Sequence, residues 1–388
     1  MCAGIEHPLD SWQHLTGGDT SMRNNIVFRS IWVGIVICTM ILPASNLPLR
    51  AQVNGPTQPP QAPPPAQAPA QPSQSAPPPP PQQQPPSGGY TMSVTIPVVN
   101  LDVVVTDEAG NPLTVFKQAN FRVTEDGVPQ TITNFGSINA PMTVVLLVEF
   151  SQLGGGLFTY NGRNWAAEFL SQMRPTDWVA LVSYSMRTNV EVDFTHDPNE
   201  ILQSLSRLIF PPFHEANEFD AISDTLDRLK DVHGKKAIVL FGSGLDTFSK
   251  LTYDKMMQKM KNTDVTFFSI STAGANTFRG QPNNLTFLQA QNELRTFAGF
   301  TGGRAWFPNF DGEIPEILKQ IAASLRDQYS MAYTPTNRAL DGKFRKIKVE
   351  LVAPDGGPLT VLDQKSKKVK CVIYARQGYT APKSSVTD

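Results

Sequence analysis

The sequence MTVVLLVEFSQL, Met142–Leu153, decides the fold. Its apolar run Val144–Val148 has no polar alternation, which is typical of a strand buried on both faces of a parallel sheet. A second run of this kind, AIVLF at Ala237–Phe241, follows after segments with helical spacing. Strands and helices therefore alternate along the chain, which predicts an α/β fold with a doubly wound, mostly parallel sheet.

The remaining elements of this sheet follow from the same two periodicities. Only four residues separate the expected strands Trp178–Tyr184 and Asn189–Phe194, so we expect these two strands to form an early hairpin. Val265–Ile270 and the short segment Arg304–Phe307 are further strand candidates. Apolar residues at helical spacing predict helices around Trp165–Met173, Ile201–Leu208, Ile222–Leu229, Tyr253–Met260, Leu285–Phe297 and Ile314–Leu325.

Both flanks of this α/β domain, which we place at residues 142–333, are expected to be β-structure. Residues 91–138 alternate as strands and are interrupted by turn clusters such as Asp107–Pro112. A module of about 50 residues is small for an independent hydrophobic core. We therefore expect a small sandwich-like module that packs against C-terminal strands within residues 341–380.

The N-terminal residues 1–51 are predicted to be an export leader. Arg29 precedes the apolar run Ile31–Leu42, and Ala51 provides a small residue at a plausible cleavage point, as in a signal peptide. The run is shorter than the roughly 20 apolar residues of a membrane-spanning helix, which favours a cleaved signal peptide. A retained signal anchor, which would need the residues through Leu49 as well, is the alternative. Met22 is a better start than Met1, because the residues before it do not resemble the beginning of a signal peptide.

Residues 52–90 form a Pro/Gln-rich linker. Of the 33 prolines in the chain, 15 lie between Pro56 and Pro86, in a segment without any apolar residue larger than alanine. Such a segment cannot bury enough apolar surface to offset the entropy of ordering, so we expect it to be disordered.

Composition excludes several classes of protein. The formal net charge is -1, so no global field favours nucleic acid. Three cysteines, Cys2, Cys38 and Cys371, are too few for a disulfide scaffold or a Cys-rich zinc module. After cleavage of the leader only Cys371 remains, and its alternating apolar neighbours predict a packed thiol.

Three loops follow the carboxyl ends of predicted strands or precede a helix at the same edge, where open α/β sheets bind their ligands. These loops are Glu149–Leu153, Phe213–Asp220 and Gly242–Thr247. The glycines Gly154–Gly156 are expected to form a flexible loop over this edge.

At these loops, and in the order of their elements, residues 142–333 resemble the von Willebrand factor type A domain, which is integrin I-like. The flanking sequences LDVVVTDEAGNPL (Leu101–Leu113) and GKFRKIKVELV (Gly342–Val352) resemble those of VWFA-related proteins described from acidobacteria. The resemblance implies a metal ion-dependent adhesion site. In that site an Asp-x-Ser-x-Ser loop, a Thr and a further Asp bind Mg²⁺ and leave one position for an acidic group of a partner.

This chain departs from the adhesion-site motif at most positions. The matching residues are, in order, Glu149, Ser151, Leu153, Ala216 and Ser243, with Asp246 three residues after the last. Two oxygen ligands are lost and one carboxylate is replaced by a hydroxyl, whereas Mg²⁺ requires near-octahedral oxygen coordination. The sequence therefore predicts a degenerate site. Glu149, Ser151 and Ser243 stay the metal candidates, Mg²⁺ is the ion that the resemblance implies, and no other cofactor is expected.

An enzymatic function is the minor alternative. A hydrolase would use Ser243 with His214 and Asp246, which are expected at one edge of the sheet. Ser243 lacks the Gly-x-Ser-x-Gly spacing, and the chain has no phosphate-binding glycine motif or zinc-protease motif. The sequence therefore favours a non-enzymatic protein.

The expected function is an exported adhesion or binding module with a protein partner in the cell envelope or extracellular space. Its location would be the periplasm, the cell surface or the medium, with membrane attachment only through an uncleaved signal anchor. The degenerate loops would form the partner-binding face, together with the apolar residues Phe150, Leu153 and Phe158. A structural component of the envelope without an external ligand is the main alternative. We expect no nucleic-acid partner.

Overall fold

The computed structural model describes residues 98–137, 140–153, 155–209, 211–271, 285–362 and 366–383. The predicted leader, its signal peptide, Met22 and the Pro/Gln-rich linker lie outside these residues. Among the helices in these ranges, none is long and apolar enough to cross a membrane.

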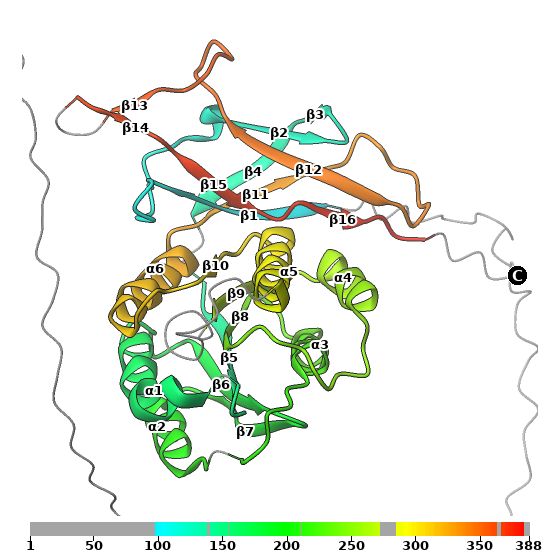
Figure 1. The fold of residues 1–388 in the computed structure, drawn as a ribbon. Coiled ribbons are helices and arrows are strands. Elements are labelled where there is room, and N and C mark those ends of the chain that lie inside the picture. The colour runs from blue at the N-terminus through cyan, green and yellow to red at the C-terminus, as the bar shows by residue number, and fades with distance from the viewer. Residues whose placement is uncertain are drawn as a thin grey trace, which may run out of the picture. The chain divides into compact units, whose positions relative to one another are not determined.

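A six-stranded sheet forms the centre of the α/β domain, in the order β10-β9-β8-β5-β6-β7 (Figure 1). All neighbouring strands run parallel except β6 and β7, which form the predicted antiparallel hairpin. Every residue of β5 and β8 is buried, as their unbroken apolar runs indicated. The strand bounds are β5 Met142–Glu149, β6 Trp178–Tyr184, β7 Thr188–Thr195, β8 Lys235–Gly242, β9 Thr266–Ser271 and β10 Ala305–Trp306.

Helices cover both faces of this sheet, each over its own apolar core. On one face, side chains of α1 (Gly155–Leu170), α2 (Pro198–Arg207) and α6 (Ile314–Arg326) pack against the strands. On the other, α3 (Glu218–Leu229), α4 (Tyr253–Asn262) and α5 (Leu285–Thr301) do so. The predicted doubly wound α/β fold is confirmed.

One local prediction in this domain was wrong. Gly155 and Gly156 begin helix α1 and do not form a loop over the sheet edge. Glycine is a poor helix former, but the following sequence through Leu170 provides Trp165 and Phe169, which are buried against the sheet. Tertiary packing of this apolar face outweighs the weak local propensity of the glycines.

A β module is built from residues on both sides of the α/β domain (Figure 1). One sheet has the order β15-β1-β11-β4 and the other the order β16-β12-β2-β3. They share an apolar core that includes Leu101, Val123, Tyr333 and Ile347. The bounds are β1 Val99–Thr106, β2 Phe121–Glu125, β3 Val128–Gln130, β4 Ile132–Ser137, β11 Tyr329–Tyr333, β12 Phe344–Leu351, β15 Val372–Ala375 and β16 Gly378–Thr380.

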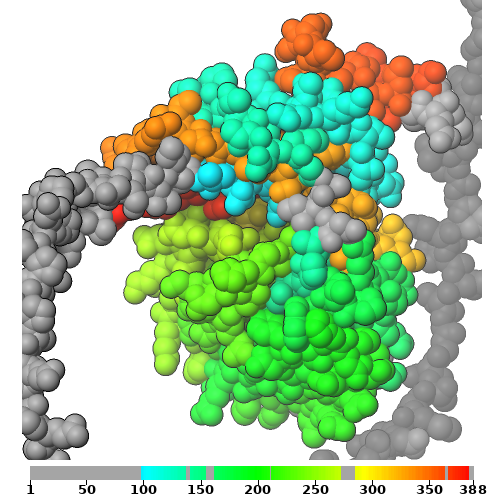
Figure 2. All heavy atoms as spheres, turned by 180° about the vertical axis from the view of Figure 1, so that it is seen from behind, coloured from blue at the N-terminus to red at the C-terminus, as the bar shows by residue number. Residues whose placement is uncertain are grey.

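Strand pairing in this module joins segments that are distant in sequence. β2 pairs with β12, and β1 pairs with both β15 and β11. Figure 2 shows the early strands in cyan directly against the late strands in orange and red. The C-terminal boundary of the α/β domain therefore lies before Tyr329 and not at residue 333, because Tyr329–Tyr333 pairs with β1 and β4. Cys371 is half-buried against this core, and burial raises the pKa of its thiol.

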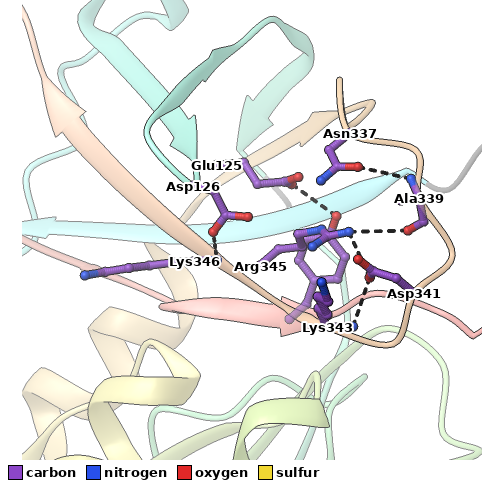
Figure 3. Close-up of polar contacts among 9 residues, drawn as sticks. Glu125, Asp126, Asn337, Ala339, Asp341, Lys343, Arg345 and Lys346 are labelled. Atoms are coloured by element: carbon purple, nitrogen blue, oxygen red, sulfur yellow. Dashed lines mark hydrogen bonds and ion pairs between the residues drawn. The ribbon is translucent and has the colours of Figure 1, made fainter.

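Polar side chains tie the strands of the β module together (Figure 3). Glu125 is buried, and its Oε2 accepts hydrogen bonds from Tyr333 at 2.8 Å and Tyr379 at 3.1 Å. Arg345 of β12 donates to Asp341 at 2.9 Å and to the carbonyl of Ala339. These bonds hold the segment before β12 against the second sheet.

Asp177 ties together the two places where the chain enters and leaves the α/β domain. Its carboxylate accepts hydrogen bonds from the backbone N–H groups of Met142, at 3.1 Å, and Arg174, at 2.6 Å, and forms an ion pair with Arg326. Met142 begins β5 and Arg326 ends α6, so one side chain fastens the two ends of the α/β domain. Burial opposes ionisation of Asp177, but the bonds from Arg326, Arg174 and Met142 outweigh it and lower its pKa.

Candidate functional site

The site lies at the carboxyl edge of the six-stranded sheet, where β5, β6 and β8 end side by side. Glu149 is the last residue of β5, Tyr184 is the last of β6, and Ser243 directly follows β8. Glu218, the first residue of α3, approaches from the helical layer and accepts a bond from Tyr184. The sheet topology thus gathers residues from four separate segments of the sequence.

Glu149 connects the loops that follow β5 and β8. Its Oε1 accepts a hydrogen bond from the Ser151 hydroxyl at 2.5 Å, and its Oε2 accepts one from the backbone N–H of Ser243. The two serine hydroxyls in turn accept backbone bonds from Leu153 and Leu245, both at 3.1 Å. A glutamate at this position therefore uses both carboxylate oxygens to fasten two neighbouring loops to each other.

Tyr184 and Glu218 belong to the same site, although the sequence analysis did not select them. The Tyr184 hydroxyl donates to Glu218 Oε2 at 3.0 Å, and both side chains are about 1% exposed. Gly242 makes room for them, since a Cβ atom there would lie 2.3 Å from the Tyr184 hydroxyl. The missed signal was the position of Tyr184, which ends a strand beside the strand that ends in Glu149.

Burial governs the electrostatics of this acidic cluster, which consists of Glu149, Glu218 and the half-buried Asp246. Burial raises the pKa of Glu149, although bonds from Ser151 and Ser243 oppose the shift. Burial, followed by the charge of Glu149, raises the pKa of Glu218 well above its usual value, and Asp246 adds to the effect. A proton on Glu218 would remove part of the repulsion among these carboxylates.

Replacing Glu218 by glutamine is expected to stabilise the protein at neutral and alkaline pH. The raised pKa of Glu218 means that the folded protein binds more protons than the unfolded chain from about pH 4.5 upward, so stability falls as pH rises through the folded pKa. Glu218→Gln removes this decline and should add on the order of 1 kcal/mol at pH 8. Urea unfolding at pH 5 and pH 8 measures this gain in unfolding free energy, with Glu215→Gln as the control. If Glu218→Gln is less stable than the wild type at pH 8, the expectation is contradicted.

The predicted site residues differ in what they can contact. Glu149, Ser151, Ala216 and Ser243 are at most 1% exposed. Buried residues cannot touch a partner, so their predicted role as direct contacts requires correction. Leu153 and Asp246 are half-buried, and Phe150 belongs to the apolar core, so it does not form a surface contact as expected. The side chain of Phe158 lies outside the described part of the structure.

The arrangement does not fit Mg²⁺. Both oxygens of Glu149 are held by hydrogen bonds, Leu153 supplies no oxygen from its side chain, and Ala216 replaces the expected threonine. Asp246 accepts bonds from the Ser249 hydroxyl at 2.5 Å and from the Phe219 N–H at 3.3 Å. In the described ranges no three His, Cys, Asp or Glu side chains are grouped so that they could hold a metal ion. Octahedral coordination would require this set of bonds to be broken.

The catalytic alternative also lacks its geometry. Ser243 is buried, and its hydroxyl accepts a bond from the N–H of Leu245. His214 is exposed, and Asp246 is bonded to Ser249 and Phe219. Within the described residues no hydrogen bond links Ser243 to His214 or Asp246, so these three do not form the triad that a serine hydrolase needs.

Comparisons with known proteins give only remote structural likeness. No protein-family model matches the chain, and no curated protein matches it in sequence. The conserved hypothetical protein BatB from Bacteroides thetaiotaomicron is 10% identical, with a TM-score of 0.36, over 47% of this chain and 98% of that one. The vWF domain of the type V pili tip protein Mfa5 from Porphyromonas gingivalis is 13% identical, with a TM-score of 0.38, over 49% and 96%. The PilB minor pilin from Streptococcus sanguinis is 11% identical, with a TM-score of 0.37, over 50% and 63%.

Proposed function

We propose that this chain is an exported binding module whose partner is a protein of the cell envelope or extracellular space. The partner-contact face is the carboxyl edge of the six-stranded sheet. In this proposal it acts without a metal ion, which is supported by the hydrogen bonds that engage both carboxylate oxygens of Glu149. The apolar run Ile31–Leu42, with its export-signal pattern, supports the exported location.

Exposed apolar side chains at this edge are the observation that carries the proposal. Phe213 is 46% exposed and Ile209 is 89% exposed, both in the segment between α2 and α3, and Phe248, which is 49% exposed, lies between β8 and α4. Further exposed apolar residues at the same edge are Leu285 and Leu288 in the first turn of α5 and Phe310 after β10. Protein interfaces are enriched in aromatic side chains, and grouped exposed apolar residues mark interaction sites.

The two phenylalanines stand on loops that the site fixes in place. The carbonyl of Phe213 accepts a hydrogen bond from the N–H of Gln152 at 2.8 Å, which ties its loop to the end of β5. The N–H of Phe248 donates to the carbonyl of Ala216 at 3.0 Å. Because the loops are already ordered, less entropy is lost when a partner binds. The buried polar residues therefore position the face, and the exposed aromatic residues contact the partner.

A double variant, Phe213→Ser with Phe248→Ser, is expected to weaken partner binding at least about tenfold, because buried aromatic anchors dominate interface energies. The measurement is capture of a co-purifying envelope protein by the full-length chain, followed by titration of that purified partner. Val115→Ser with Leu340→Ser is the matched control, since Val115 and Leu340 are exposed apolar residues of the β module. Equal loss in both double variants, or no loss in the first, contradicts the proposed face.

A further inference from the structure

A cleft lies at the amino edge of the six-stranded sheet, opposite the candidate site, where the β module meets the α/β domain. Its volume is about 700 Å³, and residues of β1, β8 and β16 line it. Its lining is about equally polar and apolar, and several of the lining side chains are charged or polar. Those used below are Asp102, Lys235, Asp264, Ser330 and Arg376.

Lys235 is the unusual member of this lining. It begins β8, opposite Met142 of β5, so its backbone is fixed by the central sheet. The residue is only 8% exposed, and its Nζ atom is buried without a hydrogen-bond partner. A buried ammonium group that lacks an acceptor is costly, and strongly perturbed buried groups cluster at functional sites.

The other charges of the cleft define what that ligand can be. The guanidinium of Arg376 is oriented by bonds from Nε to the carbonyl of Gly378, at 3.0 Å, and from Nη2 to the carbonyl of Thr263, at 3.3 Å. Asp102 lies across from Ser330 in the β1–β11 pair. Asp264, at the rim, is engaged with Lys236 at 2.8 Å. Two cationic residues, Lys235 and Arg376, and the carboxylate residue Asp102 thus line this cleft together, beside Asp264, which Lys236 neutralises.

We propose that this cleft binds a small monoanionic carboxylate, which lies in the positive field of Arg376 and accepts a hydrogen bond from Lys235 Nζ when this side chain turns from its enclosed position into the cleft. A carboxylate oxygen supplies the missing acceptor of the buried ammonium group. A dianion such as phosphate is disfavoured, because the carboxyl group of Asp102 shares the cleft and opposes a second negative charge.

Burial shifts the pKa of both Lys235 and Asp102 toward the neutral form. Burial lowers the pKa of Lys235, and the charge of Asp102 only partly opposes the shift. Burial raises the pKa of Asp102, against the charge of Lys235 and a bond from Ser330. An anion bound at Lys235 would favour its charged form and raise its pKa.

Saturation-transfer NMR on the full-length protein tests this site, with acetate, propionate and lactate as probes and inorganic phosphate as the competitor. We expect saturable binding of the carboxylates to the wild-type protein. In Lys235→Met the dissociation constant should rise at least about tenfold, as expected for one charge-assisted hydrogen bond. Methionine keeps an apolar stem in the buried position, so we expect this variant to fold, and a thermal melt checks that it does.

Lys255→Met is the matched control, because Lys255 is an exposed lysine of α4 that does not line the cleft. It should bind the carboxylates as the wild type does. The proposal is overturned if Lys235→Met binds equally well, if phosphate binds more tightly than the carboxylates, or if no probe gives a saturable signal up to about 50 mM. None of these outcomes depends on the partner-contact face at the other edge of the sheet.

Discussion

Replacing Glu149 by alanine is expected to lower the free energy of unfolding by about 3 kcal/mol. The change removes the acceptor of the Ser243 N–H and of the Ser151 hydroxyl, and both of these groups are buried. It also leaves a cavity between the ends of β5 and β8. Glutamine can keep both contacts, because its carbonyl oxygen accepts from Ser243 and its amide donates to the Ser151 hydroxyl. Glu149→Gln should therefore cost less than about 1 kcal/mol.

Urea unfolding of the two variants at the same pH separates these expectations. The loop connection should also affect the partner-contact face, so Glu149→Ala is expected to weaken partner binding although Glu149 is buried. If Glu149→Ala and Glu149→Gln are equally stable, the hydrogen bonds of Glu149 do not fasten the loops.

Replacing Asp177 by alanine is expected to cost about 3–5 kcal/mol, as for other buried ion pairs that lose one partner. The Asp177 side chain has no exposed area, and Arg326 is only 17% exposed. Without the carboxylate, the guanidinium and the N–H groups of Met142 and Arg174 lose their acceptor. Asp193→Ala is the matched control, because its ion pair with Arg228 is 69% exposed on the aspartate side and should contribute less than about 1 kcal/mol.

Acid unfolding gives an independent measurement of the Asp177 effect. The pKa of Asp177 is lowered in the folded state, so its stabilisation is present above the unfolded value of 3.8 and is lost as pH falls through the folded pKa. The stability difference between wild type and Asp177→Ala should therefore be largest near neutral pH and shrink below about pH 4. A stability difference between wild type and Asp177→Ala that stays constant down to pH 2 would contradict this interpretation.

The sequence was sufficient to predict the α/β domain because its strands are buried on both faces. Short apolar runs such as Val144–Val148 and Ala237–Phe241 can form few structures other than a buried strand. The β6–β7 hairpin follows from the short connection between its two strands. The start of α1 was missed because glycines favour a loop locally. Their helical conformation depends on the packing of the later residues of α1 against the sheet.

The site was only partly predictable. Loop positions at the sheet edge follow from topology, so Glu149, Ser151 and Ser243 could be brought together from sequence. Glu218 could not, because an acidic residue in the first turn of a helix usually favours the helix dipole at the surface. Its burial depends on the contact with Tyr184, which comes from another strand. Lys235 was missed for a similar reason, since only the structure shows that its ammonium group is enclosed.

The β4–β11 pair has a consequence for synthesis. In the sequence, the whole α/β domain lies between these two paired strands. β1 also pairs with β11, so β1 and β4 both lack this partner until β11 has been synthesised. On the ribosome, β1 emerges about 220 residues before β11, an interval of roughly 10–45 s at 5–20 residues per second. During that time the α/β domain can fold while the first strands carry unpaired edges. A chaperone that shields β-strands would therefore act on residues 98–137 of the nascent chain.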